Sequence, residues 1–272
     1  TVDGRSRSYL LNLPSNYNES SDISLVIALH GGGGNPDQFA TASGLGQKAS
    51  KAGYAVIFPA GSGRRGDRLL TWNGGYCCGY AARRNVDDLW FLTQVIADAA
   101  DRFGVAGDRV YLTGMSNGSI MAETFAAEYP DRTHAVAGVS GTMDTASFRV
   151  KGQVPALIIH GTADPMVPYD GGKGDQSLTR TDFASVASVV DAFLAPWGGG
   201  LTQTDRTIDR KDDGTSVTVT DYQQGNRVVL RLMTVTGGAH HWPGGLKARL
   251  SEGKTREIDA NTEILRFFAL HP

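Results

Sequence analysis

Three residue types that act together in nucleophilic catalysis occur in order along this chain: a serine, an aspartate and a histidine. Ser116 stands in the stretch Gly114-Met115-Ser116-Asn117-Gly118, between a strand-like run and a helix-like run. In such a G-x-S-x-G stretch the glycines let a strand turn sharply into a helix and leave the serine hydroxyl exposed. We therefore expect Ser116 to be a nucleophile rather than an ordinary helix N-cap.

The acid of such a triad is expected after a later strand, and the base on a loop near the end of the chain. Asp164 follows an apolar run in the stretch VPALIIHGTADPMVP. Asp-Pro is also a common turn pair, so a purely structural turn is the alternative. Asp170 and Asp175 are less favoured as the acid because they lie farther into a glycine-rich loop.

Two neighbouring histidines compete for the role of base in TGGAHHWPGG. Successive side chains of an irregular loop point in different directions, so we expect one of His240 and His241 to face Ser116 while the other lines the pocket or meets solvent. The residue types alone favour His240 only slightly. His30 and His160 each end a strand-like run beside a glycine, and we expect them to fix loop backbones.

Backbone amides must stabilise the oxyanion that a serine nucleophile creates. A helix beginning after Ser116 directs the Asn117 amide and the positive end of its dipole toward that charge. The stretch LHGGGGN supplies a second donor, for which Gly32 is the first choice and Gly33 the next. A phosphate-binding loop is the alternative, which is disfavoured because no Gly-Lys-Ser/Thr follows.

The elements that must position these residues alternate between strand and helix. Apolar runs predict strands over residues 24–29, 54–59, 109–113, 135–139, 156–160 and 228–235, and helical periodicity covers residues 87–103, 119–129, 183–194 and 261–270. Runs that are apolar at nearly every position are typical of strands covered on both faces. Residues 215–222 alternate instead, which predicts a strand near an edge or in a hairpin with the next run. The order predicts one α/β domain over residues 1–272, with a mostly parallel sheet and helices on both faces.

The composition narrows the classes of partner. The chain has 272 residues, with 26 basic and 28 acidic side chains, so no excess of positive charge favours nucleic acid. No apolar run approaches the roughly 20 residues of a membrane span. Because the chain begins at Thr1, we expect a processed, secreted or periplasmic protein. Its two cysteines, Cys77 and Cys78, are either free thiols or a vicinal disulfide, which an oxidising compartment would favour.

The motifs in their order resemble the polyhydroxybutyrate-depolymerase-like and feruloyl-esterase-like branch of the α/β-hydrolases. They are LHGGGGN, WNGGYCCGYA followed by VDDLWFL, GMSNGS, HGTADPMVPYDGG and GGAHHWPGG, and they cover nearly the whole chain. The resemblance implies an α/β-hydrolase fold and ester hydrolysis by Ser116, Asp164 and His240 without a metal or organic cofactor. The family pattern resembles Gly-Gly-Gly-His-Thr-Trp-Pro-Gly, with the base two positions before the tryptophan, which implies His240. Family members often carry a further cysteine in the region that here reads PWGGGLTQ, and this chain lacks it.

The substrate is the least determined feature. Trp72 and Trp242 either stack on an acyl group or anchor core and loops, and Met115 and His241 are further candidates for the pocket wall. Aromatic walls favour feruloyl or other aromatic esters, and we expect soluble or oligomeric esters in general, whereas aliphatic hydroxyacid polyesters or their oligomers are the alternative that the resemblance implies. A serine peptidase related to the prolyl oligopeptidases and a non-catalytic binding protein are the competing classes. The peptidase would carry an additional domain and the binding protein would lack a triad member.

Overall fold

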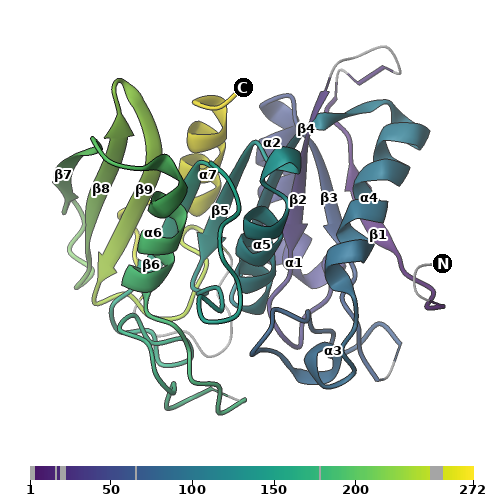
Figure 1. The fold of residues 1–272 in the computed structure, drawn as a ribbon, viewed down its shortest axis with the longest axis horizontal. Coiled ribbons are helices and arrows are strands. Elements are labelled where there is room, and N and C mark those ends of the chain that lie inside the picture. The colour runs from purple at the N-terminus through teal and green to yellow at the C-terminus, as the bar shows by residue number, and fades with distance from the viewer. Residues whose placement is uncertain (1–3, 16, 19–22, 65, 178, 246–253) are drawn as a thin grey trace.

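The computed structural model describes residues 4–15, 17–18, 23–64, 66–177, 179–245 and 254–272. Within these residues nine strands form one sheet in the order β1-β3-β2-β4-β5-β6-β9-β8-β7 (Figure 1). The strands are β1 (Tyr9–Asn12), β2 (Ile23–Leu29), β3 (Ala55–Pro59), β4 (Val105–Met115), β5 (Ala135–Val139), β6 (Ala156–Gly161), β7 (Thr202–Ile208), β8 (Ser216–Gln224) and β9 (Arg227–Thr236).

The centre of the sheet is parallel, as predicted. The parallel strands are, in order, β3, β2, β4, β5, β6 and β9. At one edge β1 pairs antiparallel with β3, and at the other edge β8 pairs antiparallel with both β9 and β7. β5 is buried at every residue, which is why its sequence is apolar throughout. β8 forms an antiparallel hairpin with β9, which confirms the hairpin expected from its alternating sequence.

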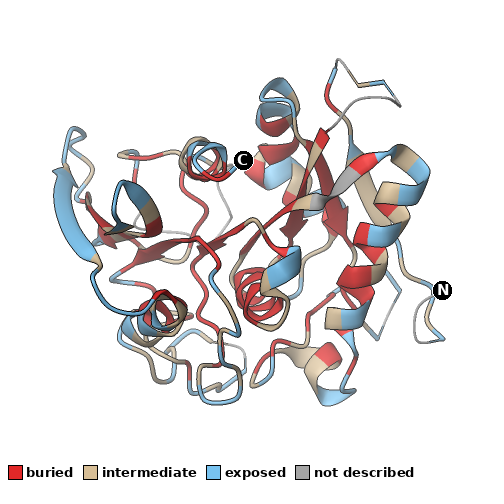
Figure 2. Cartoon of the chain, turned by 45° about the horizontal axis from the view of Figure 1, so that its top comes forward, coloured by how far each residue is buried: buried red, intermediate tan, exposed pale blue. Residues whose placement is uncertain are grey.

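Helices cover both faces of the sheet, and their buried residues, red in Figure 2, face the strands. Three helices pack into the core on one face and three into the core on the other. The first set is α4 (Asp88–Phe103), α5 (Asn117–Glu128) and α6 (Val186–Leu194); the second is α1 (Pro36–Ser43), α2 (Leu45–Lys51) and α7 (Ala260–Ala269). A shorter helix, α3 (Gly79–Arg83), lies in the long loop after β3 at the lower edge of Figure 1. None of the helices described is both long and apolar enough to cross a bilayer.

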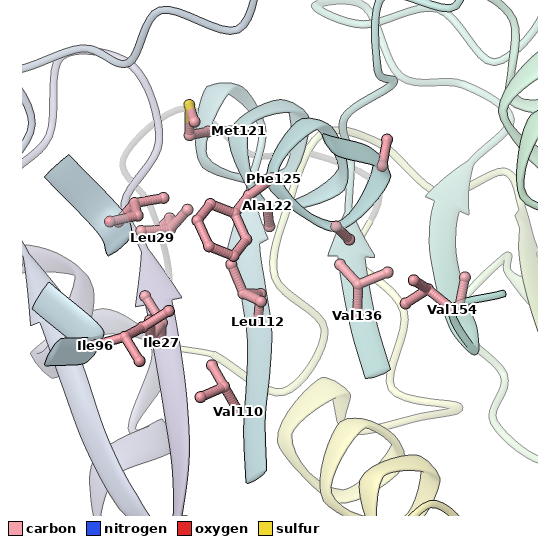
Figure 3. Packing of buried hydrophobic residues seen from close by; sticks show 14 of the residues in the cluster. Ile27, Leu29, Ile96, Val110, Leu112, Met121, Ala122, Phe125, Val136 and Val154 are labelled. Atoms are coloured by element: carbon pink, nitrogen blue, oxygen red, sulfur yellow. The ribbon is translucent and has the colours of Figure 1, made fainter. Parts of the chain in front are cut away.

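Helix α5 is held tightly over the centre of the sheet. Phe125 and Ala122 lie above Leu112 of β4, with Ile27 of β2 to one side and Val136 of β5 to the other (Figure 3). Fully burying a side chain of this size stabilises the fold by roughly 1.5–3 kcal/mol. This packing fixes the N-terminus of α5, and with it the turn that carries Ser116.

Candidate active site

Ser116 lies on the turn between β4 and α5, in a backbone conformation that residues with side chains rarely adopt. Its φ is 56° and its ψ is −124°, which costs on the order of 1–3 kcal/mol for a residue other than glycine. A hydrogen bond of 2.8 Å from the Ser116 amide to the Val139 carbonyl holds the turn. The strain is concentrated at the residue expected to act as nucleophile.

The two glycines that flank Ser116 are required by close backbone contacts. A Cβ on Gly118 would collide with the carbonyl groups of Leu29 and His30, and a Cβ on Gly114 would collide with the backbone of Gly118. β2 and β4 are neighbours in the sheet, so the serine turn packs directly against the end of β2. The G-x-S-x-G spacing therefore has a steric cause in this fold.

Asp164 follows β6, and its carboxylate is fully enclosed by hydrogen-bond donors. One oxygen, Oδ1, accepts from the amides of Met166 and Val167 at 2.9 Å each, and Oδ2 accepts from His240 Nδ1 at 2.8 Å. Burial alone would raise the pKa of Asp164, but the bond and charge of His240, the charge of His160 and the Val167 amide lower it below its ordinary value. The carboxylate is thus held ionised against the imidazole.

His240 and His241 have different partners. His240 donates through Nδ1 to Asp164 and leaves Nε2 available. His241 is buried, donates through Nδ1 to the Ala239 carbonyl at 2.9 Å, and accepts at Nε2 from the Thr255 amide at 3.2 Å. Burial lowers the pKa of His241, and both of its nitrogens are occupied by backbone groups. The structure therefore pairs His240, and not His241, with the acid.

The loops that carry the acid and this histidine are joined to each other. The Ala163 amide donates to the Gly238 carbonyl at 2.9 Å, and a Cβ on Gly161 would collide with the backbone of Gly238. β6 and β9 are parallel neighbours, so their following loops emerge at the same edge. This contact sets the separation across which His240 reaches Asp164.

Three parallel strands bring the predicted triad to one edge of the sheet. Ser116 follows β4, Asp164 follows β6 and His240 follows β9, all at carboxyl ends, which is where open α/β sheets bind ligands. No hydrogen bond joins Ser116 Oγ to His240 Nε2 among the described residues. Catalytic hydrogen bonds are often long before substrate binds and tighten afterwards.

The glycine-rich loop after β2 lies against the serine turn. A Cβ on Gly32 would lie 3.5 Å from Cβ of Asn117, and the Gly32 amide makes no backbone hydrogen bond within the described structure. The Gly33 amide, in contrast, donates to the Leu70 carbonyl at 2.8 Å. Gly33 is therefore corrected as an oxyanion candidate because its N–H is already used, and Gly32 and Asn117 remain.

His30 and His160 fix loop backbones, as expected from their positions beside glycine. His30 donates through Nδ1 to Gly31 at 2.9 Å and accepts at Nε2 from the Gly61 amide at 3.1 Å. Burial lowers its pKa to about 4, against the opposing bond to Gly31, so the ring is neutral. His160 donates through Nε2 to the Val167 carbonyl at 2.8 Å. One histidine thus holds the glycine-rich loop and the other holds the acid loop.

Trp72 is part of the core and does not line the pocket. Its side chain is fully buried and its indole Nε1 donates to the His30 carbonyl at 2.9 Å. Its backbone amide donates to Asn117 Oδ1 at 2.7 Å, and its carbonyl accepts from Asn117 Nδ2 at 3.0 Å. The expectation that Trp72 stacks on an acyl group is corrected, because an enclosed indole has no surface to offer; it supports the oxyanion loop instead.

Trp242 is likewise a buried anchor. Its Nε1 donates to Asn261 Oδ1 at 3.0 Å, and its ring meets the Phe39 ring edge-on at 5.3 Å. Met115 packs beside the same core cluster. Trp242 and His241 are buried, so these two substrate-binding expectations are corrected as well, while the half-buried Met115, next to Ser116, stays a prediction.

A pocket of about 410 Å³ opens beside Ser116 and Asn117. Its wall comes mainly from the loop after β3, of which the sequence analysis named only Trp72 as a wall candidate, and from the loop after β6, which it did not name as a pocket wall. Its apolar members are Leu69, Cys77, Ile120, Met166, Val167 and Phe183. Within the described residues, no cluster of three or more His, Cys, Asp or Glu side chains could hold a metal ion.

Two of the wall residues are the neighbouring cysteines. The structure joins Cys77 to Cys78 in a vicinal disulfide, the second of the two alternatives left open by the sequence. Cys77 is buried and Cys78 half-buried, and both border the pocket. The pair therefore forms part of the surface that a ligand at Ser116 would meet.

Comparison with known proteins shows that this chain is similar to esterases. The sequence profile described as esterase PHB depolymerase matches residues 7–150. A protein of Nocardia uniformis subsp. tsuyamanensis named as an esterase, NocK, is 32% identical over 272 aligned residues, which cover 90% of this chain and 73% of that protein. Feruloyl esterase C of Emericella nidulans is 28% identical, covering 71% of this chain and 76% of its own length.

The fold also matches solved structures. An acetyl xylan esterase from Aspergillus awamori superposes with a TM-score of 0.62 at 14% identity, over 96% of this chain and 93% of that one. Identity this low bears on the fold alone, and it confirms the predicted α/β-hydrolase architecture.

Proposed function

The chain belongs to the esterase PHB depolymerase family and is a carboxylic ester hydrolase, and we propose that it works through an acyl-enzyme formed on Ser116. The observation that carries this proposal is the 2.8 Å hydrogen bond between His240 and the buried Asp164, at the edge of the sheet where the strained Ser116 turn lies. Nucleophile, base and orienting acid are the parts that such chemistry needs.

In the proposed reaction the free Nε2 of His240 takes the Ser116 proton as Oγ attacks the ester carbonyl carbon. Asp164, which accepts from Nδ1, stabilises the imidazolium that forms. His240 then gives the proton to the leaving alcohol oxygen as the tetrahedral intermediate collapses to the acyl-enzyme. Water, activated by the same nitrogen, attacks the acyl carbon, and the acid product leaves with Ser116 restored.

The negative charge of each tetrahedral intermediate is assigned to two backbone amides. Asn117 contributes the first-turn amide of α5, and Gly32 contributes an amide from the adjacent loop. Losing one donor of this kind typically costs 10²–10³-fold in kcat. The His30 and Trp72 contacts that hold the loop are therefore part of the catalytic framework.

We propose small or oligomeric esters as the substrates. The pocket beside Ser116 is apolar at its base and holds about 410 Å³, the size range of a small ligand. Leu69 supports a role in binding: the residue is 68% exposed at the pocket wall, and its φ of 53° is strained for a bulky residue. A feruloyl group and a hydroxyacid oligomer both suit such a pocket, and the similarity to a feruloyl esterase supports the feruloyl group as a candidate.

The test is a rate comparison on matched esters. Purified protein and its Ser116→Ala variant are assayed on methyl ferulate, p-nitrophenyl acetate and butyrate, and a hydroxybutyrate oligomer. We expect the variant to lose nearly all turnover on every ester while keeping the wild-type melting temperature. Wild-type-like turnover by Ser116→Ala would contradict the acyl-enzyme, and the ratio between ferulate and hydroxybutyrate rates assigns the acyl class.

We also propose that the protein functions in an oxidising compartment, secreted or periplasmic. The support is the Cys77–Cys78 disulfide, since disulfides persist outside the reducing cytoplasm. A thiol titration of the denatured protein checks this proposal, because two titratable thiols would remove its support.

A further inference from the structure

The wall of the pocket beside Ser116 carries a one-sided set of charges. Three arginines border it, Arg64, Arg68 and Arg83, and no aspartate or glutamate does so among the described residues. The chain as a whole has a formal charge of −2. The pocket is therefore positive on a molecule that is slightly negative.

These arginines are exposed and available. All three are exposed to solvent, and none forms an ion pair with a carboxylate in the described part of the chain. Asp67, the sequence neighbour of Arg68, does not border the Ser116 pocket; it lines an adjoining hollow of which Arg68 is also a wall residue. Structural arginines elsewhere do have carboxylate partners, as Arg231 has Asp221 at 2.5 Å.

The arginines surround an apolar pocket floor. Ile120, Val167 and Phe183 are buried at the pocket floor, whereas Arg64 and Arg68 come from the loop after β3 and Arg83 from the end of α3. A ligand that fits both parts has an apolar segment ending in a negative group. Guanidinium groups bind carboxylates through paired N–H donors, a geometry that a lysine cannot supply.

We propose that Arg64, Arg68 and Arg83 select esters that carry a free carboxylate, either at the far end of the acyl chain or on the alcohol part. Half-esters of dicarboxylic acids and acid-terminated oligoesters belong to this class. This inference rests on the proposed function, since it names the substrate class of the Ser116 site. The carboxylate binds at the arginines while the ester carbonyl lies at Ser116.

Matched pairs of esters test the proposal. Monomethyl adipate is compared with methyl adipamate, in which a neutral amide replaces the acyl-side carboxylate, and 5-acetoxypentanoate with 5-acetoxypentanamide for the alcohol side. Rates are followed by pH-stat at about 20 mM and 500 mM NaCl. We expect one pair to show a kcat/KM roughly five- to tenfold higher for the anion at low salt, and a ratio near one at high salt, because exposed charges are screened.

Arginine variants identify the source of the preference. Arg68→Gln and Arg83→Gln, singly and together, should lower the anion-to-amide ratio by raising KM for the anionic esters. Arg132→Gln is the control, because it removes the same charge from an exposed site beyond the far end of α5. That helix has 12 residues, which separates Arg132 from Ser116 by roughly 18 Å.

The outcomes separate the two levels of proposal. An anion-to-amide ratio at or below one for both pairs at low salt overturns the carboxylate assignment, as does an equal loss of preference in Arg132→Gln. If the two neutral esters, methyl adipamate and 5-acetoxypentanamide, are hydrolysed by the wild type and not by Ser116→Ala, the acyl-enzyme is supported whatever the charge preference. Absence of hydrolysis of all four esters overturns the carboxylate assignment, while the methyl ferulate and p-nitrophenyl ester assays decide the acyl-enzyme proposal separately.

Discussion

His240 and His241 are neighbours in the chain but differ in what their nitrogens can do. His240 bonds to the Asp164 carboxylate through Nδ1 and keeps Nε2 free, whereas both nitrogens of His241 bond to backbone groups. We expect His240→Gln to lower kcat by roughly 10³–10⁴-fold, and Asp164→Asn to do the same by disrupting the imidazole's orientation and charge. His241→Gln should keep kcat within about tenfold and lower the melting temperature.

Steady-state kinetics and thermal unfolding of the three variants check this difference. The result that would reverse the assignment is a loss of kcat in His241→Gln larger than in His240→Gln, with both proteins folded.

The residue types predicted the His240–Asp164 pairing at the sheet edge better than they predicted which side chains line the pocket. A strand-to-helix turn with flanking glycines makes Ser116 recognisable, and chain order leads to Asp164. The choice between His240 and His241 needed the family pattern, because their different bonds depend on the Ala239 and Thr255 backbones. Trp72 and Trp242 were misassigned because an indole serves a core and a pocket equally well in sequence, and burial decides between them.

At the level of elements, one side chain connects the loop after β3 to the start of α5. The Asn117 amide group bonds to both the N–H and the C=O of Trp72. Asn117→Ala keeps the backbone donor proposed for the oxyanion but leaves the buried N–H of Trp72 without a partner, while the Trp72 carbonyl keeps its bond from the Cys78 amide. We expect a loss of about 1–3 kcal/mol in the free energy of unfolding, together with a fall in kcat as the Gly32 loop loosens.

Urea denaturation and kcat measured on the same preparations test this link. Asn35→Ala is the control: it removes a single exposed cap bond to the Gln38 amide of α1, so it should cost about 1 kcal/mol and leave kcat unchanged. An Asn117→Ala protein as stable and active as wild type would show that the loop does not depend on this contact.

Strands that are buried were predictable, and strands formed by pairing alone were not. β5, with its apolar sequence Ala135–Val139, matches the expected range at both ends. β7 has the sequence TQTDRTI, and nearly all of it is exposed, so it has no apolar alternation to detect. It exists because β8 offers it a hydrogen-bonding edge. β1 and the short helices α1 to α3 were missed for the related reason that their sequences are short and mixed.

For the molecule as a whole, buried ionisable groups oppose each other in their effect on stability. Burial lowers the pKa values of His30 and His271 to about 4 from an ordinary 6.5. As the pH falls, these two histidines are protonated in the unfolded chain before they are protonated in the folded chain. The stability that the neutral histidines contribute is therefore present above about pH 6.5 and is lost as the pH falls toward 4. These histidines therefore destabilise the fold in acid.

Glu123 acts in the opposite direction. It is buried on α5, where Ser119 Oγ donates to its Oε1 at 3.0 Å, and burial raises its pKa from 4.5 to about 8 despite that bond. Its protonated form is the one that the folded state favours. The stability that it contributes is fully present below about pH 4.5 and is lost as the pH rises toward 8.

Together these groups predict a stability maximum near pH 6.5. Between about pH 4.5 and 6.5 the two histidines outweigh the single carboxyl, so stability rises; above about 6.5 Glu123 acts alone and stability falls by about 2 kcal/mol up to pH 8. Glu123→Gln cannot ionise, so its free energy of unfolding should stay level over that interval and should rise more steeply than in the wild type between about pH 4.5 and 6.5, where Glu123 no longer opposes the histidines. Glu128→Gln, on the same helix but paired with Lys151 at the surface, should keep the decline. Urea denaturation at pH 5, 6.5, 7.25 and 8 measures all three proteins, and an equally steep alkaline decline in Glu123→Gln would assign it to another group.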